Sequence, residues 1–368
     1  MSDRRVMTGP SRLIKVFTPS FADEANSNAQ NLTVKEVVAR LDPERFHVTM
    51  LSVRDPDPRI VRRKNTTLFP YYEHGNTLYL VLRLLANRPD IYFFPRQGPL
   101  DRVFLDTKRY FFRKTALVSY VVMMMNDATS SGIMSRLILE ADRVYANSIF
   151  VSETVYARFG VQTDAVYDGA DQRFFFPRPE RKGPSSKPIV LYAGSFEPRK
   201  RVACVIEQAM RIPGAEFRLA GRGVTEPACR ALVRERGCGN VAFLGHLNAA
   251  QLGEQMREAD VFLFPSVVEG HPQVLIQATA CGLPSVAMSV YRPEAIVDGE
   301  TGFLADNDQE LADKLDLLLS DSVLRQKMSA AAVRHAQRFD WDRIALQWAD
   351  IFQETAQQKK RGDRGHQG

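Results

Sequence analysis

Short apolar runs alternate along the chain with segments whose apolar residues recur at helical spacing. This alternation is typical of the βαβ units that build parallel sheets. In the first half, the apolar runs predict strands at Leu13–Thr18, His47–Val53, Asp90–Phe94, Thr115–Met125, Arg143–Ala146 and Ala165–Tyr167. Helical spacing predicts helices between them at Leu32–Leu41, Thr77–Ala86 and Ile149–Phe159.

A segment rich in charge, Pro, Gly and Ser, Arg178–Pro188, interrupts this pattern. Such a composition is typical of an interdomain linker, which we place at 181–188. A second βα series follows, with strands predicted at Ile189–Ala193, Glu216–Ala220, Val241–Leu244, Val261–Phe264, Ser285–Ala287 and Gly302–Ala305. Helices are expected from Val202, Glu226 and Pro272 onward, and at Asp308–Leu319, Ser322–Ala336 and Asp340–Thr355.

The two series predict an α/β protein with two Rossmann-like, doubly wound domains, 1–180 and 189–339, on either side of a cleft. Helix 340–356 could pack back on the first domain, and the polar tail 357–368 is expected to be disordered. Such sheets bind ligands at the carboxyl ends of their strands. The architecture leaves a transferase, an epimerase and a dehydrogenase open. A dehydrogenase is disfavoured because no G-x-G-x-x-G run follows the first strand.

The composition is that of an ordinary globular protein, but the charge is unevenly distributed. Hydrophobic residues make up 45% and charged residues 25% of the 368 residues, and the net charge is +6. The segment Arg54–Lys114 alone has 13 Lys and Arg against 6 Asp and Glu, a local excess of +7. A positive surface favours anionic partners such as phosphates, nucleic acid or acidic membranes.

The cysteines and the termini bear on metal binding and localisation. Six histidines show no metal-ligand spacing, and no C-x-x-C pair occurs among Cys204, Cys229, Cys238 and Cys281. We therefore expect reduced thiols, no metal and no cofactor. Lys15 and Pro19 interrupt the first apolar run, which is unlike a signal peptide. The longest apolar run, Ala116–Met125, is about half the length of a membrane span, so a cytoplasmic protein is expected.

The most informative segment for chemistry is Glu269–Pro284, which reads EGHPQVLIQATACGLP. It follows the predicted strand Val261–Phe264, so Glu269 lies in a loop at the carboxyl end of that strand. Taken alone, Glu269 could be an ordinary acid of a surface loop. The residues that follow it favour a ligand site instead.

A helix is expected to begin just after Glu269, near Pro272. Gly270 lets the backbone approach a ligand closely. A helix N-terminus presents free amides and a partial positive charge to a phosphate or a sugar oxygen. Gln277 lies one turn inside the helix, on the side that can face the same ligand. The free amides expected at this N-terminus are those of Gln273, Val274 and Leu275.

This segment closely resembles the E-x7-E region of glycosyltransferase family 4, a retaining family of GT-B fold whose typical run is EGFPxxxxEAxACGxPV. The resemblance implies that Glu269 contacts the donor sugar. The family's second Glu binds the ribose hydroxyls, and Gln277 takes its place. Because a neutral amide makes weaker hydrogen bonds than a carboxylate, the exchange is expected to cost about 1–3 kcal/mol of donor binding.

The loop Gly194–Lys200, GSFEPRK, is similar to the family's GRxxxxKG loop, whose Arg and Lys hold the donor diphosphate. The resemblance implies that Lys200 contacts the diphosphate, with Arg199 beside it. Ser195 stands where the family usually has Arg, so Arg199 or Arg201 would have to supply that cation. Without this context, a solvated basic loop is the simpler interpretation.

Two further matches are weaker. Gly221 and Gly223 follow the next strand and resemble the family's G-x-G, although any turn between a strand and a helix favours glycine. Phe243–Leu247 resembles the FxGxV segment that lines the nucleobase pocket. His246 could therefore contact the base, or it could be an ordinary loop histidine.

In the first half, Ala141–Ser148 and Tyr167–Pro177 resemble the family's structural runs ADRVxAxS and NGVDxxxFxP. Asn126 and Asp127 stand where the family commonly has a His-Asp pair near the donor sugar. Asn126 does not titrate, so Asp127 is the remaining candidate for an acid–base role.

The family's Gly-rich loop after the first strand is replaced here by a polar loop. Its side chains Asn26, Ser27 and Asn28 could contact an acceptor hydroxyl or a phosphate. The same region could instead be a plain helix N-cap, at Asn31 or Thr33.

The resemblance implies a retaining glycosyltransferase in which 189–339 binds a UDP- or GDP-sugar and 1–180 binds a glycan, glycolipid or small-molecule acceptor. Catalysis without a protein nucleophile is implied, with Glu269, Asp127 and Lys200 in catalytic places. The alternative is a catalytically impaired homologue that binds a sugar or a partner, since Gln277, Ser195 and Asn126 all depart from the family pattern. A GT-B sugar-nucleotide epimerase fits the motifs less well.

The basic and aromatic segment Arg83–Lys114 lies on the acceptor side. It could rest on an anionic bilayer, which would make the protein peripheral at the inner membrane surface. Its aromatic residues could equally be core residues with solvated charges between them. Nucleic-acid binding is not expected, because no nucleic-acid module accompanies the charge.

Overall fold

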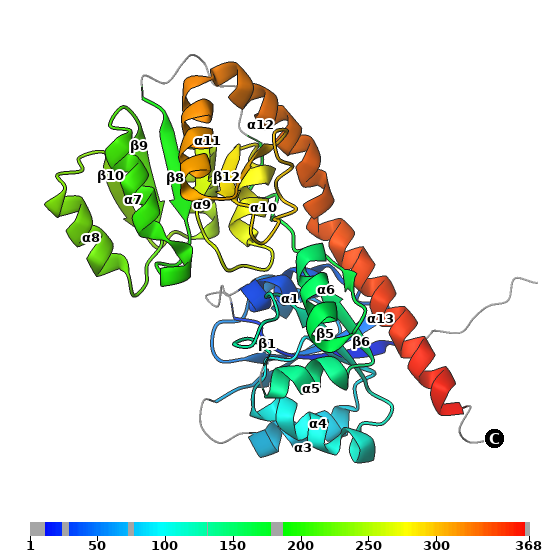
Figure 1. The fold of residues 1–368 in the computed structure, drawn as a ribbon. Helices are drawn as coiled ribbons and strands as arrows, with labels where there is room; N and C mark the ends of the chain where they lie inside the picture. The colour runs from blue at the N-terminus through cyan, green and yellow to red at the C-terminus, as the bar shows by residue number, and fades with distance from the viewer. Residues whose placement is uncertain (1–11, 24–28, 73–76, 131, 178–186, 365–368) are drawn as a thin grey trace, which may run out of the picture. The chain divides into compact units, whose positions relative to one another are not determined.

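The computed structural model describes residues 12–23, 29–72, 77–130, 132–177 and 187–364, which divide into two compact units (Figure 1). Unit 1 comprises the residues up to Val166 together with those from Asp342 onward, and unit 2 runs from Tyr167 to Trp341. The chain thus leaves unit 1 once and returns to it through its last helix. Each unit is built around one parallel sheet, as the βα alternation predicts.

In the described part of unit 1, the sheet has seven parallel strands in the order β3-β2-β1-β4-β5-β6-β7. The order reverses between β1 and β4, the position at which open α/β sheets bind their ligands. The strands are β1 Ile14–Phe21, β2 Phe46–Ser52, β3 Thr66–Pro70, β4 Ile91–Phe93, β5 Ala116–Val121, β6 Arg143–Ala146 and β7 Asp164–Ala165.

Neighbouring residues of β4 show how helices cover both faces of this sheet. Tyr92 stacks on Phe104 with ring centroids 4.0 Å apart, whereas Phe93 meets Trp348 at 4.7 Å. Since successive strand residues point to opposite faces, the helices that carry Phe104 and Trp348 lie on opposite sides. The helices before the last one are α1 Ala29–Arg40, α2 Pro58–Arg62, α3 Thr77–Asn87, α4 Pro99–Phe111, α5 Ile133–Leu139 and α6 Ile149–Phe159.

The last helix, α13 (Trp341–Arg364), is held on unit 1 by aromatic packing. Trp348 is fully buried, and its ring lies 5.1 Å from that of Tyr120 and 5.5 Å from that of Tyr145. The disorder expected from residue 357 is wrong as far as Arg364, because the helix continues there. Lys359 pairs with Asp142 at 2.6 Å and anchors this end. Residues 365–368 lie outside the described residues.

In the described part of unit 2, the sheet has six parallel strands in the order β10-β9-β8-β11-β12-β13. The strands are β8 Ile189–Ala193, β9 Glu216–Ala220, β10 Val241–Gly245, β11 Val261–Phe264, β12 Ser285–Met288 and β13 Gly302–Ala305. The helices are the 3₁₀ turn η1 Pro198–Lys200, α7 Val202–Arg211, α8 Glu226–Glu235, α9 Ala249–Glu258, α10 Gln273–Ala280, α11 Asp308–Ser320, α12 Ser322–Ala336 and the 3₁₀ turn η2 Gln337–Phe339.

The boundary between the units differs from the one expected near residue 180. Residues from Tyr167 onward belong to unit 2 because their backbone bonds to it. The amide of Ala170 donates to the carbonyl of Phe339 at 3.0 Å, and Arg257 donates to the carbonyl of Phe174 at 2.7 Å. Of the linker expected at 181–188, residues 181–186 lie outside the described residues.

Hydrophobic periodicity missed β3, α2, α4, α5 and α9. In α4, charged residues at frequent intervals break up the apolar pattern, yet Leu100, Phe104 and Leu105 are buried. α2 is short and begins at the Asp55-Pro56-Asp57 run. There the Asp57 carboxylate caps the helix by accepting from the amide of Arg59 at 2.9 Å.

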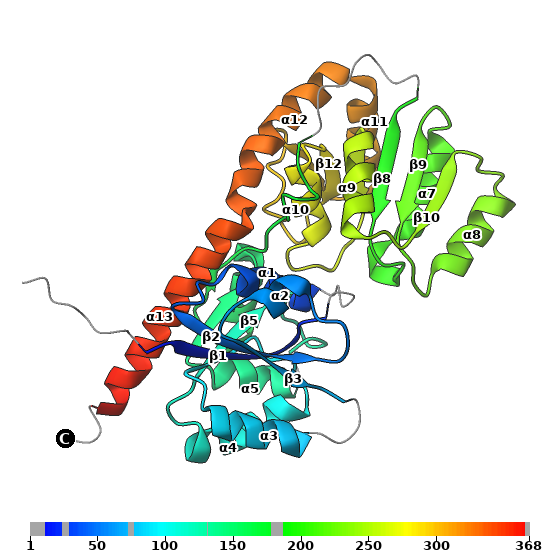
Figure 2. The same ribbon diagram turned by 180° about the vertical axis from the view of Figure 1, so that it is seen from behind.

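No helix in the described parts of the chain is long and apolar enough to cross a bilayer. The helices α3 and α4 lie side by side on one face of the unit 1 sheet in both views (Figures 1 and 2). Their inner sides pack in one hydrophobic cluster that includes Leu80, Leu84 and Phe104. Their outer sides leave Leu78, Leu82 and Phe111 exposed.

Candidate functional site

Two loops of unit 2 meet at the carboxyl edge of its sheet. β8 and β11 are parallel neighbours, with Val190 paired to Val261. The loop after β8 leads through η1 to Lys200, and the loop after β11 leads through Glu269 to α10. Because both strands end at the same edge, the basic loop and the acidic loop are delivered to one place.

The Glu269 carboxylate is the centre of this site. It is 8% exposed, and its Oε1 accepts hydrogen bonds from Lys200 Nζ at 2.5 Å, from Arg199 Nη1 at 2.9 Å and from the Ser266 hydroxyl. No described residue donates a hydrogen bond to Oε2. One carboxylate oxygen is therefore fully engaged by the protein, while the other can meet a ligand hydroxyl.

The electrostatics of the site depend on burial. Lys200 is 8% exposed, and its ammonium lies 4.9 Å from the centre of the Phe264 ring. Desolvation lowers the pKa of Lys200, while the Glu269 carboxylate opposes the shift. Arg199 also donates to the carbonyl of Val268 at 2.9 Å and to Glu197 at 2.9 Å. Lys200 and Arg199 thus face two acids, Glu269 and Glu197, so the charges of the cluster balance, and an anion would be held by hydrogen bonds from these two cations.

Arg199 and Arg201 are the two candidates for the cation that is missing where Ser195 replaces the family's Arg. Arg201 has a left-handed backbone with φ of 53°, and its guanidinium pairs with Asp308 at 2.5 Å. Arg199 instead bonds to Glu269. Of the two arginines considered, Arg199 is therefore the one gathered with Lys200.

Gly221 and Gly223 shape the basic loop through their backbones. Both have positive φ, 139° and 158°. A Cβ on Gly221 would lie 1.8 Å from the carbonyl oxygen of Gly194, and one on Gly223 would lie 2.5 Å from that of Phe196. These glycines let the turn after β9 pack directly on the loop that leads to Lys200. Their donor-binding role stays a prediction.

The N-terminus of α10 carries unpartnered polar side chains. Both polar side-chain atoms of Gln273 are buried and have no protein partner. The same holds for the side-chain Oε1 of Gln277, a residue that is 9% exposed. Such groups cost free energy unless they bind something. Of the three amides expected to be free here, that of Leu275 is occupied, because it donates to the carbonyl of Pro272 at 3.0 Å. The amides of Gln273 and Val274 remain the candidates, next to buried Gly270.

His271 is a buried residue that the motif comparison passed over. It is 4% exposed, its ring lies 5.5 Å from Tyr167 and 5.4 Å from Phe339, and neither nitrogen has a partner among the described residues. Burial, reinforced by the charges of Arg338 and His335, lowers its pKa to about 3. The signal that could have found it was its position two residues after Glu269.

The remaining candidates lie in less constrained positions. His246 is exposed at the end of β10. In unit 1, Asp127 is exposed and pairs with Arg158 at 2.9 Å. The side-chain oxygen of Asn126 accepts from the amides of Ala128 and Thr129, so it holds a local turn. The functional roles of these residues stay predictions, and Asn26, Ser27 and Asn28 lie outside the described residues.

Two further expectations concern a helix N-cap and a metal site. The N-cap expected at Asn31 or Thr33 is wrong, because α1 begins at Ala29 and the Asn31 oxygen accepts from the amide of Phe21 in β1 at 3.0 Å. Within the described residues, no group of three His, Cys, Asp or Glu side chains could hold a metal. That the reaction needs no metal stays a prediction.

Comparisons with known proteins bear on both units. Residues 187–321 match the family model described as Glycosyl transferases group 1. The chain is 30% identical over 248 residues to the D-inositol 3-phosphate glycosyltransferase of Mycobacterium tuberculosis, a match covering 61% of this chain and 52% of that protein. The chain thus spans about half the length of the curated relatives it matches.

Solved structures resemble almost the whole chain. Sucrose-phosphate synthase from Thermosynechococcus elongatus superposes with a TM-score of 0.76 at 20% identity, covering 93% of this chain and 99% of that one. HepE from Anabaena, solved with UDP and glucose, gives 0.74 at 18% identity and covers 93% and 100%. At these identities the likeness concerns the fold, and it confirms the predicted GT-B fold.

The burial of His271 predicts a pH dependence of stability. Its folded pKa of about 3 lies below its ordinary value of 6.5, so the unfolded chain binds a proton that the folded chain does not. The free energy of unfolding therefore has its full value above about pH 6.5. It decreases as the pH is lowered, by about 2 kcal/mol between pH 7 and pH 5. We expect His271→Phe to remove that part of the loss, measured as urea unfolding at both pH values.

The matched control for this test is His246→Phe, because His246 is exposed. It should keep the pH dependence of the unchanged protein. An identical loss of stability in the His271 variant and in the unchanged protein would contradict the assignment.

Proposed function

We propose that this chain, whose residues 187–321 match the Glycosyl transferases group 1 family model, is a retaining glycosyltransferase. It would move a sugar from a UDP- or GDP-sugar to a hydroxyl of a glycan, a glycolipid or a small molecule. The observation that carries the proposal is the buried Glu269 carboxylate. One of its oxygens accepts hydrogen bonds from Lys200 and Arg199 at the carboxyl edge of the parallel sheet of unit 2.

The donor fits this cluster as an anion with a hydroxylated sugar. Lys200 and Arg199 would bind the diphosphate through charge-assisted hydrogen bonds, each worth about 1.5–3 kcal/mol. The free Oε2 of Glu269 would accept a hydrogen bond from a sugar hydroxyl. The polar atoms of Gln273 and Gln277, which lack protein partners, would be satisfied by the donor. His246 would lie toward the nucleobase.

The reaction breaks the bond between the anomeric carbon and the diphosphate oxygen and forms a bond from the same face to the acceptor oxygen. The acceptor proton passes to the departing diphosphate oxygen, so no protein nucleophile is needed. Lys200 and Arg199 would stabilise the negative charge that develops on the leaving group. These two cations would do the work of a metal ion, which supports catalysis without a metal. Asp127, Asn126 and the loop with Asn26, Ser27 and Asn28 are proposed for the acceptor side.

A turnover assay decides between the enzyme and an impaired homologue that only binds. The protein is incubated with UDP-, GDP- and ADP-sugars, and release of the nucleoside diphosphate is followed with and without candidate acceptors. Release with one donor supports the enzyme. Nucleotide binding without release would favour the impaired homologue, and neither binding nor release would refute the donor site.

Substitution of Lys200 tests the diphosphate assignment. Lys200→Met keeps the length of the side chain but removes one charge-assisted hydrogen bond, so we expect nucleoside diphosphates to bind about ten- to hundredfold more weakly. A thermal shift with UDP or GDP measures this, since a ligand stabilises the folded state by mass action. Arg201→Gln is the matched control, because Arg201 pairs with Asp308. An undiminished shift in Lys200→Met would refute the assignment.

Gln277→Glu restores the carboxylate that the family has at this position. Two charge-assisted hydrogen bonds to the ribose hydroxyls should replace weaker neutral ones, so we expect nucleotide affinity to rise about five- to hundredfold. Titration calorimetry measures the change. Gln309→Glu, on the exposed start of α11, adds the same charge away from the site and should leave affinity unchanged. Equal effects of the two variants would argue against ribose binding by α10.

A cytoplasmic location with peripheral attachment to an anionic inner membrane surface is also proposed. The support is the exposed outer side of α3 and α4, where Leu78 is 71% exposed and Tyr110 and Phe111 are each 63% exposed. Lys108, Arg109 and Lys114 lie in the same stretch as these aromatic residues. Aromatic residues favour the headgroup region, and each basic side chain near it contributes about 1 kcal/mol.

Vesicle binding tests this membrane contact. We expect the double substitution Tyr110→Ser and Phe111→Ser to lower binding to phosphatidylglycerol vesicles at least about tenfold, because two apolar side chains no longer enter the headgroup region. Co-sedimentation measures the bound fraction. Leu346→Ser, at a site 65% exposed on α13, is the matched control. Equal binding of the double variant and the unchanged protein would contradict the contact.

A further inference from the structure

Unit 1 contains a pocket of about 840 Å³ that no part of the proposed reaction uses. It lies at the amino ends of two strands, since Ala116 is the first residue of β5 and Arg143 is the first residue of β6. Ligands of doubly wound sheets bind at the opposite, carboxyl edge. Its wall is formed by Leu105, Asp106, Lys108, Arg109, Arg113, Ala116, Arg136, Glu140, Asp142, Arg143, Thr355, Gln358 and Lys359. We call it the α4–α13 pocket.

The acids of the α4–α13 pocket are all neutralised by cations of its own wall. Asp142 pairs with Lys108 at 2.8 Å and with Lys359 at 2.6 Å. Arg136 pairs with both Asp106 and Glu140, each at 2.7 Å. Six cations thus face three acids in the wall, an excess of three positive charges.

The excess charge belongs to Arg109, Arg113 and Arg143. Arg143 donates to the neutral amide oxygen of Gln358, and Arg109 lies 4.6 Å from the centre of the Tyr110 ring. Within the described residues, no carboxylate pairs with these three guanidiniums. Each therefore keeps its charge available for an anion in the pocket.

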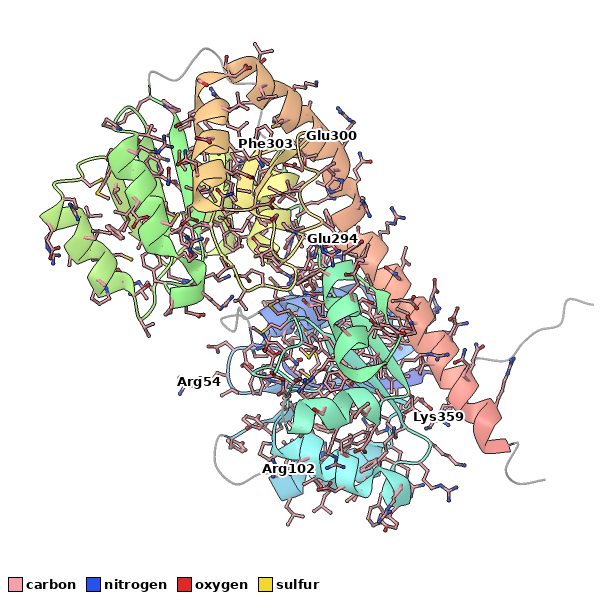
Figure 3. All side chains as sticks on the ribbon, in the orientation of Figure 1. Arg54, Arg102, Glu294, Glu300, Phe303 and Lys359 are labelled. Carbon is pink, nitrogen blue, oxygen red and sulfur yellow. The ribbon has the colours of Figure 1, made fainter. Side chains whose placement is uncertain are left out.

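Asp142 connects three elements of the pocket wall. Its carboxylate also accepts from the amide of Leu117 in β5 at 2.8 Å, so it joins α4, β5 and α13 through one side chain. Although burial opposes ionisation, the hydrogen bonds from Lys108 and Lys359 hold the pKa of Asp142 below its usual value. Lys359, labelled in Figure 3, comes from the helical extension of α13 that replaces the expected disordered tail.

We infer that the α4–α13 pocket binds a phosphate-bearing anion. The volume suits a small molecule, and guanidinium groups match phosphate oxygens with paired donors. The phosphate could come from a soluble phosphate ester or from an anionic phospholipid headgroup, because exposed Tyr110 and Phe111 lie in the same stretch as Arg109. The inference does not depend on sugar transfer.

Calorimetry with inorganic pyrophosphate tests the soluble source. The Lys200→Met protein is used throughout, so that the proposed donor site contributes little. We expect Arg109→Gln combined with Arg113→Gln to weaken pyrophosphate binding at least about tenfold. Arg102→Gln, an exposed arginine of α4 outside the pocket wall, is the matched control and should change nothing. Circular dichroism verifies that each variant is folded.

Vesicles of phosphatidylglycerol, compared with phosphatidylcholine vesicles, test the lipid source. Pyrophosphate binding that depends on Arg109 and Arg113 supports a soluble ligand, while vesicle binding alone with the same dependence supports a headgroup. Phe111→Ser alone, which keeps Tyr110 against Arg109, separates the pocket from simple membrane contact, since it should leave pyrophosphate binding unchanged. The inference is overturned if neither probe binds, or if both bind the arginine double variant as well as they bind the Arg102 control.

Discussion

The candidate site depends on one buried carboxylate whose charge is balanced inside the protein. Glu269 lies at 8% exposure because Lys200 and Arg199 bond to it, and each of those cations would in turn cost free energy if left unpaired at this edge. The pairing is possible because β8 and β11 are adjacent and parallel. Lys200, Arg199 and the Ser266 hydroxyl all donate to the same carboxylate oxygen, Oε1. The geometry of the sheet thus holds two cations around one buried acid and leaves Oε2 for a ligand.

Much of this could be predicted from local patterns. The strands Ile189–Ala193 and Val261–Phe264 were predicted with the bounds they have, because buried parallel strands are short continuous apolar runs bounded by loops. Lys200 and Glu269 lie in the loops that follow those strands, and the rule that ligands meet the carboxyl edge of a sheet predicted a ligand site at Glu269. The same rule could not rank Arg199 against Arg201, which are two residues apart.

What the sequence did not reveal depends on contacts between distant residues. Arg201 pairs with Asp308, which is 107 positions away, instead of joining the cluster around Glu269. His271 is buried between Tyr167 and Phe339. The end of α13 is polar enough to suggest disorder, yet Lys359 bonds to Asp142 across 217 positions. Periodicity describes only local order, whereas these interactions are set by packing between segments that lie far apart in the chain.

Charge balance separates the α4–α13 pocket from ion pairs that hold the fold. Around Glu36, Arg59 also pairs with Asp57 and Arg40 also pairs with Asp342, so no positive charge is left over and the group acts as a structural tie. Around Glu269 the two cations likewise face two acids, because Arg199 pairs with Glu197 as well. That site therefore depends on the free Oε2 and on the unpartnered side-chain atoms of α10 rather than on surplus charge. In the α4–α13 pocket six cations face three acids, and this surplus is available to a phosphate.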